Sequence, residues 1–209
     1  MIIKFLGYNP IFMMRQSEAT IPITQGIFNL IAYADDITEQ MPHVAMVAEG
    51  MDASKPVTIR IHSECLTGDL FGSKRCDCGE QLERSLEILA EKRGVLIYLR
   101  QEGRGIGLIN KLRAYQLQDT GLNTLDANTH LGLKVDDRHY DIALNILKDL
   151  GITSINLLTN NPDKIAAFAD GEITVVKRLP LITIPLPENK NYLNTKKELL
   201  GHLLGGKNK

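Results

Sequence analysis

The sequence shows no marked excess of either charge and no long hydrophobic segment. It has 24 lysines and arginines against 25 aspartates and glutamates, a formal net charge of −1 at pH 7. A general nucleic-acid binder is expected to carry a clear basic excess, so that class is disfavoured and any anionic ligand must be held by a local cluster of cations. The apolar residues 1–14 are interrupted by Lys4 and Pro10, and no small-residue cleavage site follows them. They make a poor signal peptide and are too short to span a membrane.

Cysteine is also scarce, and internal repeats and low-complexity segments are missing. The chain has three cysteines, and an odd number without an export signal favours a reducing cytoplasm. Its 209 residues, 44% hydrophobic and 23% charged, are typical of one soluble globular domain. We therefore predict a single domain over residues 1–209, ending in a frayed tail at 205–209.

The three cysteines occur close together, in the pattern C-x10-C-x-C, at Cys65, Cys76 and Cys78. Thiolates are soft ligands that suit zinc, and a zinc ion with only three protein ligands keeps a fourth position for water, as catalytic sites do. Zinc lowers the pKa of bound water toward about 7, and nucleobase deaminases use this chemistry on a ring carbon. The alternative is three reduced cysteines packed as small core residues. Their neighbours Arg75 and Asp77 argue against a core.

Hydrophobic periodicity predicts an α+β (mixed α/β) fold. A β-rich N-terminal part is followed by helix–strand units, with the site in loops at strand ends. We expect strands at 26–33, 43–48, 57–62, 95–99, 155–158 and 172–176. We expect helices between Cys78 and Gly94, at 108–119, around 142–150, in a short turn from Pro162, and within 189–204. Residues 123–138 have no periodicity and are expected to be a long functional loop, and 178–187 an edge or a wrapping arm.

Two loops have features of anion sites. The loop over residues 100–107 contains glycines at 103, 105 and 107 and opens a helix, and such a helix N-terminus favours an anion. A plain tight turn explains the glycines equally well, except that Glu102 and Arg104 lie among them. In the second loop Thr159 and Lys164 can hold phosphate, and the alternative there is helix capping with a solvated lysine.

Taken together, five phrases resemble the GTP cyclohydrolase II family, in its stand-alone form. They are RIHSECLTGD (60–69), RCDCG (75–79), RQEGRGIGL (100–108), LRAYQLQD (112–119) and LLTNNP (157–162). The resemblance runs from about Val57 to Leu204. Many family members are fused to a second enzyme domain, for which this sequence has no room.

The resemblance implies functional residues by position. It implies that zinc is bound by Cys65, Cys76 and Cys78. It implies GTP contacts from Arg60, Ile61, His62, Ser63, Glu64, Gln81, Glu102, Gly103, Arg104, Thr124, Thr159 and Lys164. Asp136 matches the proton acceptor, Arg138 the nucleophile toward the α-phosphate, and Tyr115 the tyrosine beside the reacting imidazole ring. His62 and His130 match no metal ligand. The family also uses magnesium for pyrophosphate release and is typically a homodimer, and neither a nucleic acid nor a membrane is an expected partner.

The implied reaction opens the imidazole ring of GTP and releases formate and pyrophosphate, which is the first step of riboflavin biosynthesis. One alternative is hydrolysis that stops at the formylated pyrimidine, which the family associates with loss of the tyrosine at the position of Tyr115. Others are a catalytically silent nucleotide-binding homologue and a zinc-dependent interaction domain. Two roles of Arg138 stay open, because a guanidinium with a pKa above about 12 is a demanding nucleophile and can instead clamp phosphate oxygens. Tyr115, taken alone, fits a helix-face aromatic packed in the core.

Overall fold

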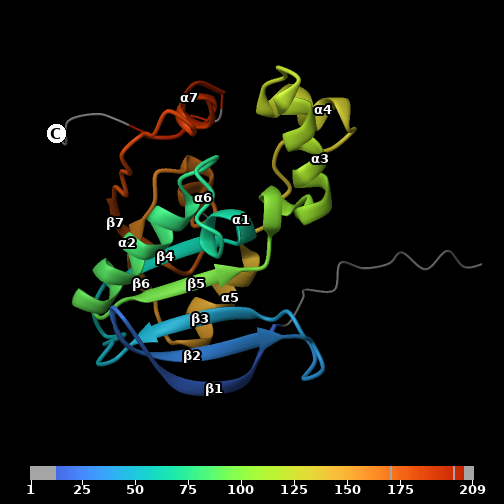
Figure 1. The fold of residues 1–209 in the computed structure, drawn as a ribbon. Helices are drawn as coiled ribbons and strands as arrows, with labels where there is room; N and C mark the ends of the chain where they lie inside the picture. The colour runs from blue at the N-terminus through green and yellow to red at the C-terminus, as the bar shows by residue number, and fades with distance from the viewer. Residues whose placement is uncertain (1–12, 170, 200, 205–209) are drawn as a thin grey trace, which may run out of the picture.

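A seven-stranded mixed sheet runs through the molecule (Figure 1). The computed structural model describes residues 13–169, 171–199 and 201–204. The strands are β1 Met14–Ile23, β2 Gly26–Ala34, β3 His43–Ala48, β4 Val57–Ser63, β5 Val95–Leu99, β6 Ser154–Leu158 and β7 Thr174–Leu179. Their order in the sheet is β1-β2-β3-β5-β4-β6-β7. Strand β1 pairs with β2, β2 with β3 and β3 with β5 in antiparallel fashion. Strand β5 pairs with β4, β4 with β6 and β6 with β7 in parallel.

Helices connect the strands of the parallel half, and a further helix follows β7. They are α1 Leu66–Asp69, α2 Cys78–Glu91, the 3-10 turn η1 Glu102–Gly105, α3 Gly107–Asp119, α4 Thr124–His130, α5 Asp141–Asp149, α6 Pro162–Ala166 and α7 Lys190–Leu199. The mixed α/β class predicted from the sequence is confirmed. Among the helices of the described ranges, we find none with the length and apolar character needed to cross a bilayer.

Apolar residues cover the sheet on both faces. Successive residues of a strand point to opposite faces, and β5 shows the division clearly. Val95 and Ile97 belong to a cluster that contains Ile146 and Leu147 of α5. Leu96, between them, packs in a second cluster with Leu89 of α2. Helices α5 and α2 therefore cover opposite faces of the sheet, and burial on both sides explains the continuous apolar sequence of β5.

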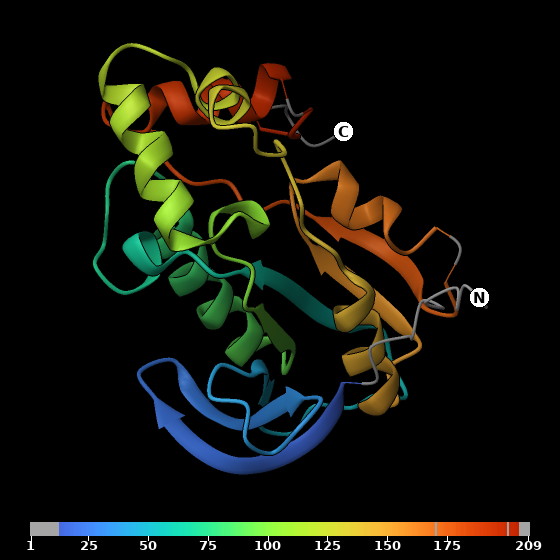
Figure 2. The same ribbon diagram turned by 90° about the vertical axis from the view of Figure 1, so that its right-hand side faces the viewer.

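The carboxyl ends of the parallel strands mark the place of the site. From β4 the chain passes through α2 to β5 on one side, and β6 lies on the other side of β4. In sheets of this kind ligands bind outside the carboxyl ends of the strands, where the strand order reverses. Both views place α3, α4 and α7 at one end of the molecule, away from β1, β2 and β3 (Figures 1 and 2).

Several predicted boundaries were wrong. Residues 123–138 are not all loop, because α4 begins after Asn123, whose side chain accepts a hydrogen bond from the Asp126 amide at 2.9 Å. Strand β1 was not predicted, since it is an edge strand with mostly exposed residues and lacks an apolar alternation. Strand β7 begins and ends later than the predicted 172–176, and α7 fills only part of 189–204. The expected tail at 205–209 lies outside the described residues, and the single domain over 1–209 stays a prediction.

Candidate active site

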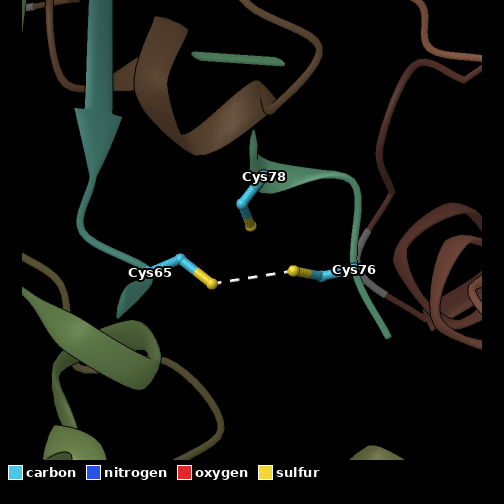
Figure 3. Close-up of side chains that lie close together, drawn as sticks. All are labelled: Cys65, Cys76 and Cys78. Carbon is cyan, nitrogen blue, oxygen red and sulfur yellow. Dashed lines mark hydrogen bonds between the residues drawn. The ribbon is translucent and has the colours of Figure 1, made fainter. Parts of the chain in front are cut away.

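The three cysteine side chains meet after the end of β4. Cys65 precedes α1, Cys76 lies in the following loop and Cys78 begins α2. Their sulfur atoms all lie within 4.8 Å of one another, and those of Cys65 and Cys76 are 3.6 Å apart. Figure 3 shows the three side chains pointing into one shared space. A tetrahedral zinc with Zn–S bonds of 2.3 Å needs sulfurs about 3.8 Å apart. The donor set and its spacing therefore fit a zinc ion.

The backbone of α1 comes close to this cluster because Gly68 has no side chain. A Cβ at Gly68 would lie 2.9 Å from the Cys76 sulfur and 3.2 Å from the Cys65 sulfur. A Cβ at Gly79 would lie 2.4 Å from the carbonyl oxygen of Gly68. Both glycines of the RIHSECLTGD and RCDCG phrases thus allow α1 and the start of α2 to pack around the thiols.

Lys111 of α3 supplies a positive charge to the cluster. Its Nζ lies 3.1 Å from the Cys65 sulfur and donates hydrogen bonds to Thr67 Oγ1 and Glu102 Oε1, both at 2.9 Å. Contacts with the other two sulfurs, together with Lys111, lower the pKa of the Cys65 thiol. The contact with Cys65 raises the pKa of the Cys76 thiol to about 11. Metal binding must therefore release protons from the cluster, since the ligands are thiolates.

A buried polar network fixes the Cys65 backbone. Asp69 accepts hydrogen bonds from the Cys65 amide at 3.0 Å and from the Tyr98 hydroxyl at 2.8 Å. Nε2 of His62 lies 3.1 Å from both carboxylate oxygens of Asp69. Burial lowers the pKa of His62. His62 therefore contacts a residue that orients the cluster and is not part of the three-residue metal group. His130 is exposed at the end of α4.

The cysteines open into a large cavity with a predominantly cationic lining. The space not filled by protein atoms measures about 1050 Å³, part of it open to solvent. Among the described lining residues, the carboxylates are Glu64 and Glu102. The lysines and arginines are more numerous: Arg60, Arg104, Lys111, Arg138, Lys164 and Lys196. Such a concentration of positive charge favours a polyanionic ligand, although the whole chain is nearly neutral.

Arg104 shows strain and unused hydrogen-bonding capacity in the same residue. Its φ of 63° lies in the left-handed region, which costs a non-glycine residue about 1–2 kcal/mol. Both terminal nitrogens of its guanidinium are buried without a hydrogen-bond partner among the described residues. Buried charged donors are normally paired. Arg104 lines the cavity, so these two donors are available to a ligand there.

Lys164, in helix α6, lies deep in the cavity wall. Its Nζ donates a hydrogen bond to the Ile61 carbonyl oxygen at 2.7 Å. Burial, reinforced by the positive charges of Arg60 and Arg138, lowers the pKa of Lys164 well below the usual value for a lysine. An anionic ligand would reverse this effect, because it would favour the charged ammonium.

Asp136 and Arg138 form a tight ion pair. The two carboxylate oxygens lie 2.9 and 3.1 Å from Arg138 Nε, and one also contacts a terminal guanidinium nitrogen. Burial lowers the pKa of Arg138, but its hydrogen bonds with Asp136 and the charge interactions with Asp136 and nearby tyrosines together outweigh that effect, and the pKa is raised. Burial raises the pKa of Asp136, but its hydrogen bonds with Arg138 and the positive charges of Arg138 and Arg104 together outweigh that effect, and the pKa is lowered. Both shifts oppose transfer of a proton from Arg138 to Asp136.

Tyr115 lines the cavity from α3, so the interpretation as a purely core aromatic is wrong. The Arg75 guanidinium lies 4.6 Å and the Lys111 ammonium 5.8 Å from the centroid of its ring. Arg75 also forms an ion pair with Asp119, which lies on α3 like Tyr115. Burial raises the pKa of the Tyr115 hydroxyl, so this group stays protonated at neutral pH.

The structure brings together most of the residues that the sequence singled out. The predicted catalytic, GTP-binding and zinc residues line the cavity, with two exceptions. The side chain of Ile61 is fully buried, and its carbonyl oxygen accepts the hydrogen bond from Lys164. Asp136 is not a lining residue but is paired with Arg138, which is one. Lys111 was missed, although it is one helical turn before Tyr115 and therefore shares its face. Tyr192, Lys196 and His202 were also missed, and no local pattern could have placed them in the cavity.

The comparisons with known proteins agree with the sequence resemblance. A family model described as GTP cyclohydrolase II matches residues 14–180. The riboflavin biosynthesis protein RibBA of Bacillus cytotoxicus is 50% identical over 204 residues, which are 97% of this chain and 51% of that protein. RibBA of Bacillus cereus is 49% identical over the same shares. The chain thus spans about half the length of the curated relatives it matches.

A solved structure shows a weak similarity to this chain. It is the crystal structure of RibBX, a two-domain 3,4-dihydroxy-2-butanone 4-phosphate synthase from A. baumannii, with a TM-score of 0.44 and 20% identity over 78% of this chain and 39% of that one. Membership rests instead on the family model, which covers most of the chain, and on the site motifs that lie inside the matched residues. The chain belongs to the GTP cyclohydrolase II family.

Proposed function

We propose that this chain is an enzyme that opens the imidazole ring of GTP by hydrolysis, as the first step of riboflavin biosynthesis. It releases formate and pyrophosphate and leaves 2,5-diamino-6-(5-phosphoribosylamino)pyrimidin-4(3H)-one. The observation that carries the proposal is that a cluster of three thiols and a set of cations line one cavity. A nucleotide needs both, because its base must reach the metal while its phosphates are neutralised.

The thiol end of the cavity is assigned to the ring chemistry. Cys65, Cys76 and Cys78 would hold zinc, which would supply a Lewis acid and water activated for attack at neutral pH. Tyr115 faces the same space as a protonated hydroxyl, and so acts as a proton donor or positions water beside the ring. Lys111 compensates the negative charge of the thiolates and keeps Cys65 deprotonated.

The cationic part of the cavity is assigned to the phosphates. Arg104 offers two guanidinium nitrogens that have no hydrogen-bond partner within the described ranges, and Lys164 offers an ammonium whose buried surroundings are mostly cationic. Both neutralise charge on the leaving pyrophosphate, together with magnesium. Thr159, whose side chain is buried at the end of β6, and Thr124 of α4 line the same cavity and are assigned as further GTP contacts.

Arg138 is assigned as a clamp on the α-phosphate and not as a covalent nucleophile. Its pairing with Asp136 keeps the guanidinium charged, and a charged guanidinium has no lone pair to attack phosphorus. A fixed cation of this kind binds phosphate oxygens well. Single-turnover reactions analysed by mass spectrometry test the assignment. A nucleotidyl adduct on Arg138 would overturn it.

The experiment that tests the activity is incubation with GTP, zinc and magnesium, followed by identification of the products by mass. Wild-type protein is expected to give formate, pyrophosphate and the diaminopyrimidine. Cys76→Ser is expected to lose ring opening while it retains pyrophosphate release, because the phosphate contacts lie elsewhere in the cavity. Absence of all products from the zinc-loaded wild type would refute the proposal and favour a silent nucleotide-binding homologue.

A second outcome is hydrolysis that stops at the formylated pyrimidine. Tyr115 in the cavity argues for the complete reaction, and the ratio of formate released to GTP consumed separates the two outcomes. We place the reaction in the cytoplasm, in line with the reduced thiols. We also propose a homodimer, and exposed apolar side chains such as Phe71 and Ile109 support an interface.

A further inference from the structure

The C-terminal segment, residues 181–204, reaches the cavity although it lies beyond the residues matched by the family model. Tyr192 and Lys196 of α7 and His202 after it are among the lining side chains. In Figure 1, α7 lies on one side of this end of the molecule and α3 and α4 on the other. The segment is therefore a wall of the cavity that the family match does not explain.

Asp77 anchors this wall to the metal loop. It lies between Cys76 and Cys78 and is only 2% exposed. Its carboxylate accepts hydrogen bonds from Lys196 Nζ at 2.7 Å and from Thr183 Oγ1 at 3.2 Å. Two separate points of the C-terminal segment thus converge on one buried carboxylate. A buried ion pair of this kind fixes geometry strongly, because neither partner can be left uncompensated.

The same carboxylate also contacts Gln81, one of the residues expected to bind GTP. Gln81 donates a hydrogen bond to Asp77, and Arg60 donates one to Gln81, both at 2.5 Å. Lys196 is therefore linked through Asp77 to Gln81 and Arg60. At the far end of the segment, the Leu203 amide donates to the Asn160 carbonyl oxygen at 2.9 Å. The segment is fixed at both ends to residues of the cavity.

Tyr192 lies between two cations. Its ring centroid is 4.4 Å from Lys196 Nζ and 5.8 Å from the Arg104 guanidinium carbon. Both distances are within the range of cation–π interactions. The ring thus supports Arg104, whose terminal nitrogens are buried without a partner among the described residues. Both cations thus contact the same ring at the cavity wall, and Lys196 is the one with an ion-pair partner among the described residues, Asp77.

We infer that residues 181–204 complete the nucleotide pocket, with Lys196 as a further residue that binds the phosphates and Tyr192 as a positioning residue for Arg104. Lys196 can keep its bond to Asp77 and still donate two hydrogen bonds to phosphate oxygens, because an ammonium has three donors. This inference rests on the proposed function, since it assigns new residues to the same substrate.

The test compares Lys196→Met with Lys197→Met, the same change at the exposed next residue of α7. Calorimetry measures binding of inorganic tripolyphosphate, of an α,β-methylene analogue of GTP and of guanosine. We expect Lys196→Met to weaken the first two at least tenfold and guanosine less than twofold. Its thermal transition should be lower than that of the wild type, because buried Asp77 loses its cationic partner. Lys197→Met should match the wild type, and Lys196→Arg should recover most of the affinity. In turnover, Lys196→Met should raise KM more than it lowers kcat.

The inference would be overturned if the two methionine variants bound tripolyphosphate with equal affinity, or if Lys196→Met weakened guanosine binding as much as tripolyphosphate binding. In either case, turnover of GTP by the wild type would leave the proposed function standing. A wild type that consumes no GTP would overturn both. If Lys196→Met does not fold, Tyr192→Leu gives an independent test, since it removes the ring and leaves the Asp77 pair in place. It should weaken tripolyphosphate binding at least threefold, and unchanged binding would overturn the role of Tyr192 and with it the inference.

Discussion

Replacement of Gly68 by alanine should weaken zinc binding without disturbing the rest of the fold. The added Cβ would lie 2.9 Å from the Cys76 sulfur, whereas ordinary contact begins at 3.4 Å. The sulfur must therefore retreat by about 0.5 Å, more than the tolerance of about 0.2 Å in a metal–ligand distance. Alanine also favours helix over glycine, so the backbone of α1 is not itself weakened.

The size of the effect follows from the cost of overpacking. Inserting a methyl group into a closely packed site costs about 1–3 kcal/mol. At about 1.4 kcal/mol for each factor of ten, the zinc affinity should fall by roughly 5- to 150-fold. Competition with a chromophoric chelator measures this change directly on the purified protein, with reduced thiols.

Gly171→Ala is the matched control. A Cβ at Gly171 would meet its nearest neighbours at 3.7 and 3.8 Å, which is ordinary contact. This variant should bind zinc like the wild type. If Gly68→Ala also bound zinc with wild-type affinity, the three sulfurs would not share the ion in the arrangement described here, and the assignment of the metal site would fail.

Three further predictions concern single side chains. Burial, with the charges of Lys196 and Arg138, lowers the pKa of His202 to about 3. Between pH 6.5 and 3 the unfolded state therefore binds more protons than the folded state. As the pH falls through this window, the unfolding free energy of the wild type should decrease relative to that of His202→Gln. If urea titrations showed that the difference between the two proteins does not depend on pH, this prediction would be contradicted. The pKa of Lys164 is also lowered, so the unfolded state again binds more protons than the folded state, here at higher pH. Without nucleotide, the unfolding free energy of the wild type should therefore rise relative to that of Lys164→Met from about pH 7 toward 10. A difference in thermal melts that does not change with pH would contradict the lowered pKa of Lys164. Tyr115→Phe should lower the amount of formate released for each GTP consumed. If the hydroxyl acts as a general acid, the rate of formate release should fall by about 100-fold. An unchanged ratio of formate to GTP would mean that Tyr115 contributes through the face of its ring alone.

Local patterns were sufficient to predict the elements of the parallel half. Strands β4, β5 and β6 are short apolar runs bounded by turn residues, and each was placed within one or two residues. Buried strands of this kind differ from helices in length and in β-branched content, which a sequence displays. The edge strand β1 and the short helix α4 were not predicted, because neither buries a continuous apolar face.

The site was predictable where its residues form a local motif or match the family by position. The cysteine spacing and the glycine-rich loop at 100–107 were visible, and the cavity contains both. The contribution of α7 was not visible, because the contact of Lys196 with Asp77 joins residues 119 positions apart. The hydrophobic periodicity of a helix indicates which of its faces is buried, but it does not indicate which distant segment of the chain packs against that face.

The separation of these two residues has a consequence during synthesis of the protein. Cys76 and Cys78 leave the ribosome long before α7, so the growing chain holds both thiols without the carboxylate–lysine bond that covers their loop. Closure of a contact so distant in sequence is slow. The newly made chain therefore passes through a period in which the loop that carries two of its thiols lacks this anchor, and the folding of α7 onto Asp77 ends that period.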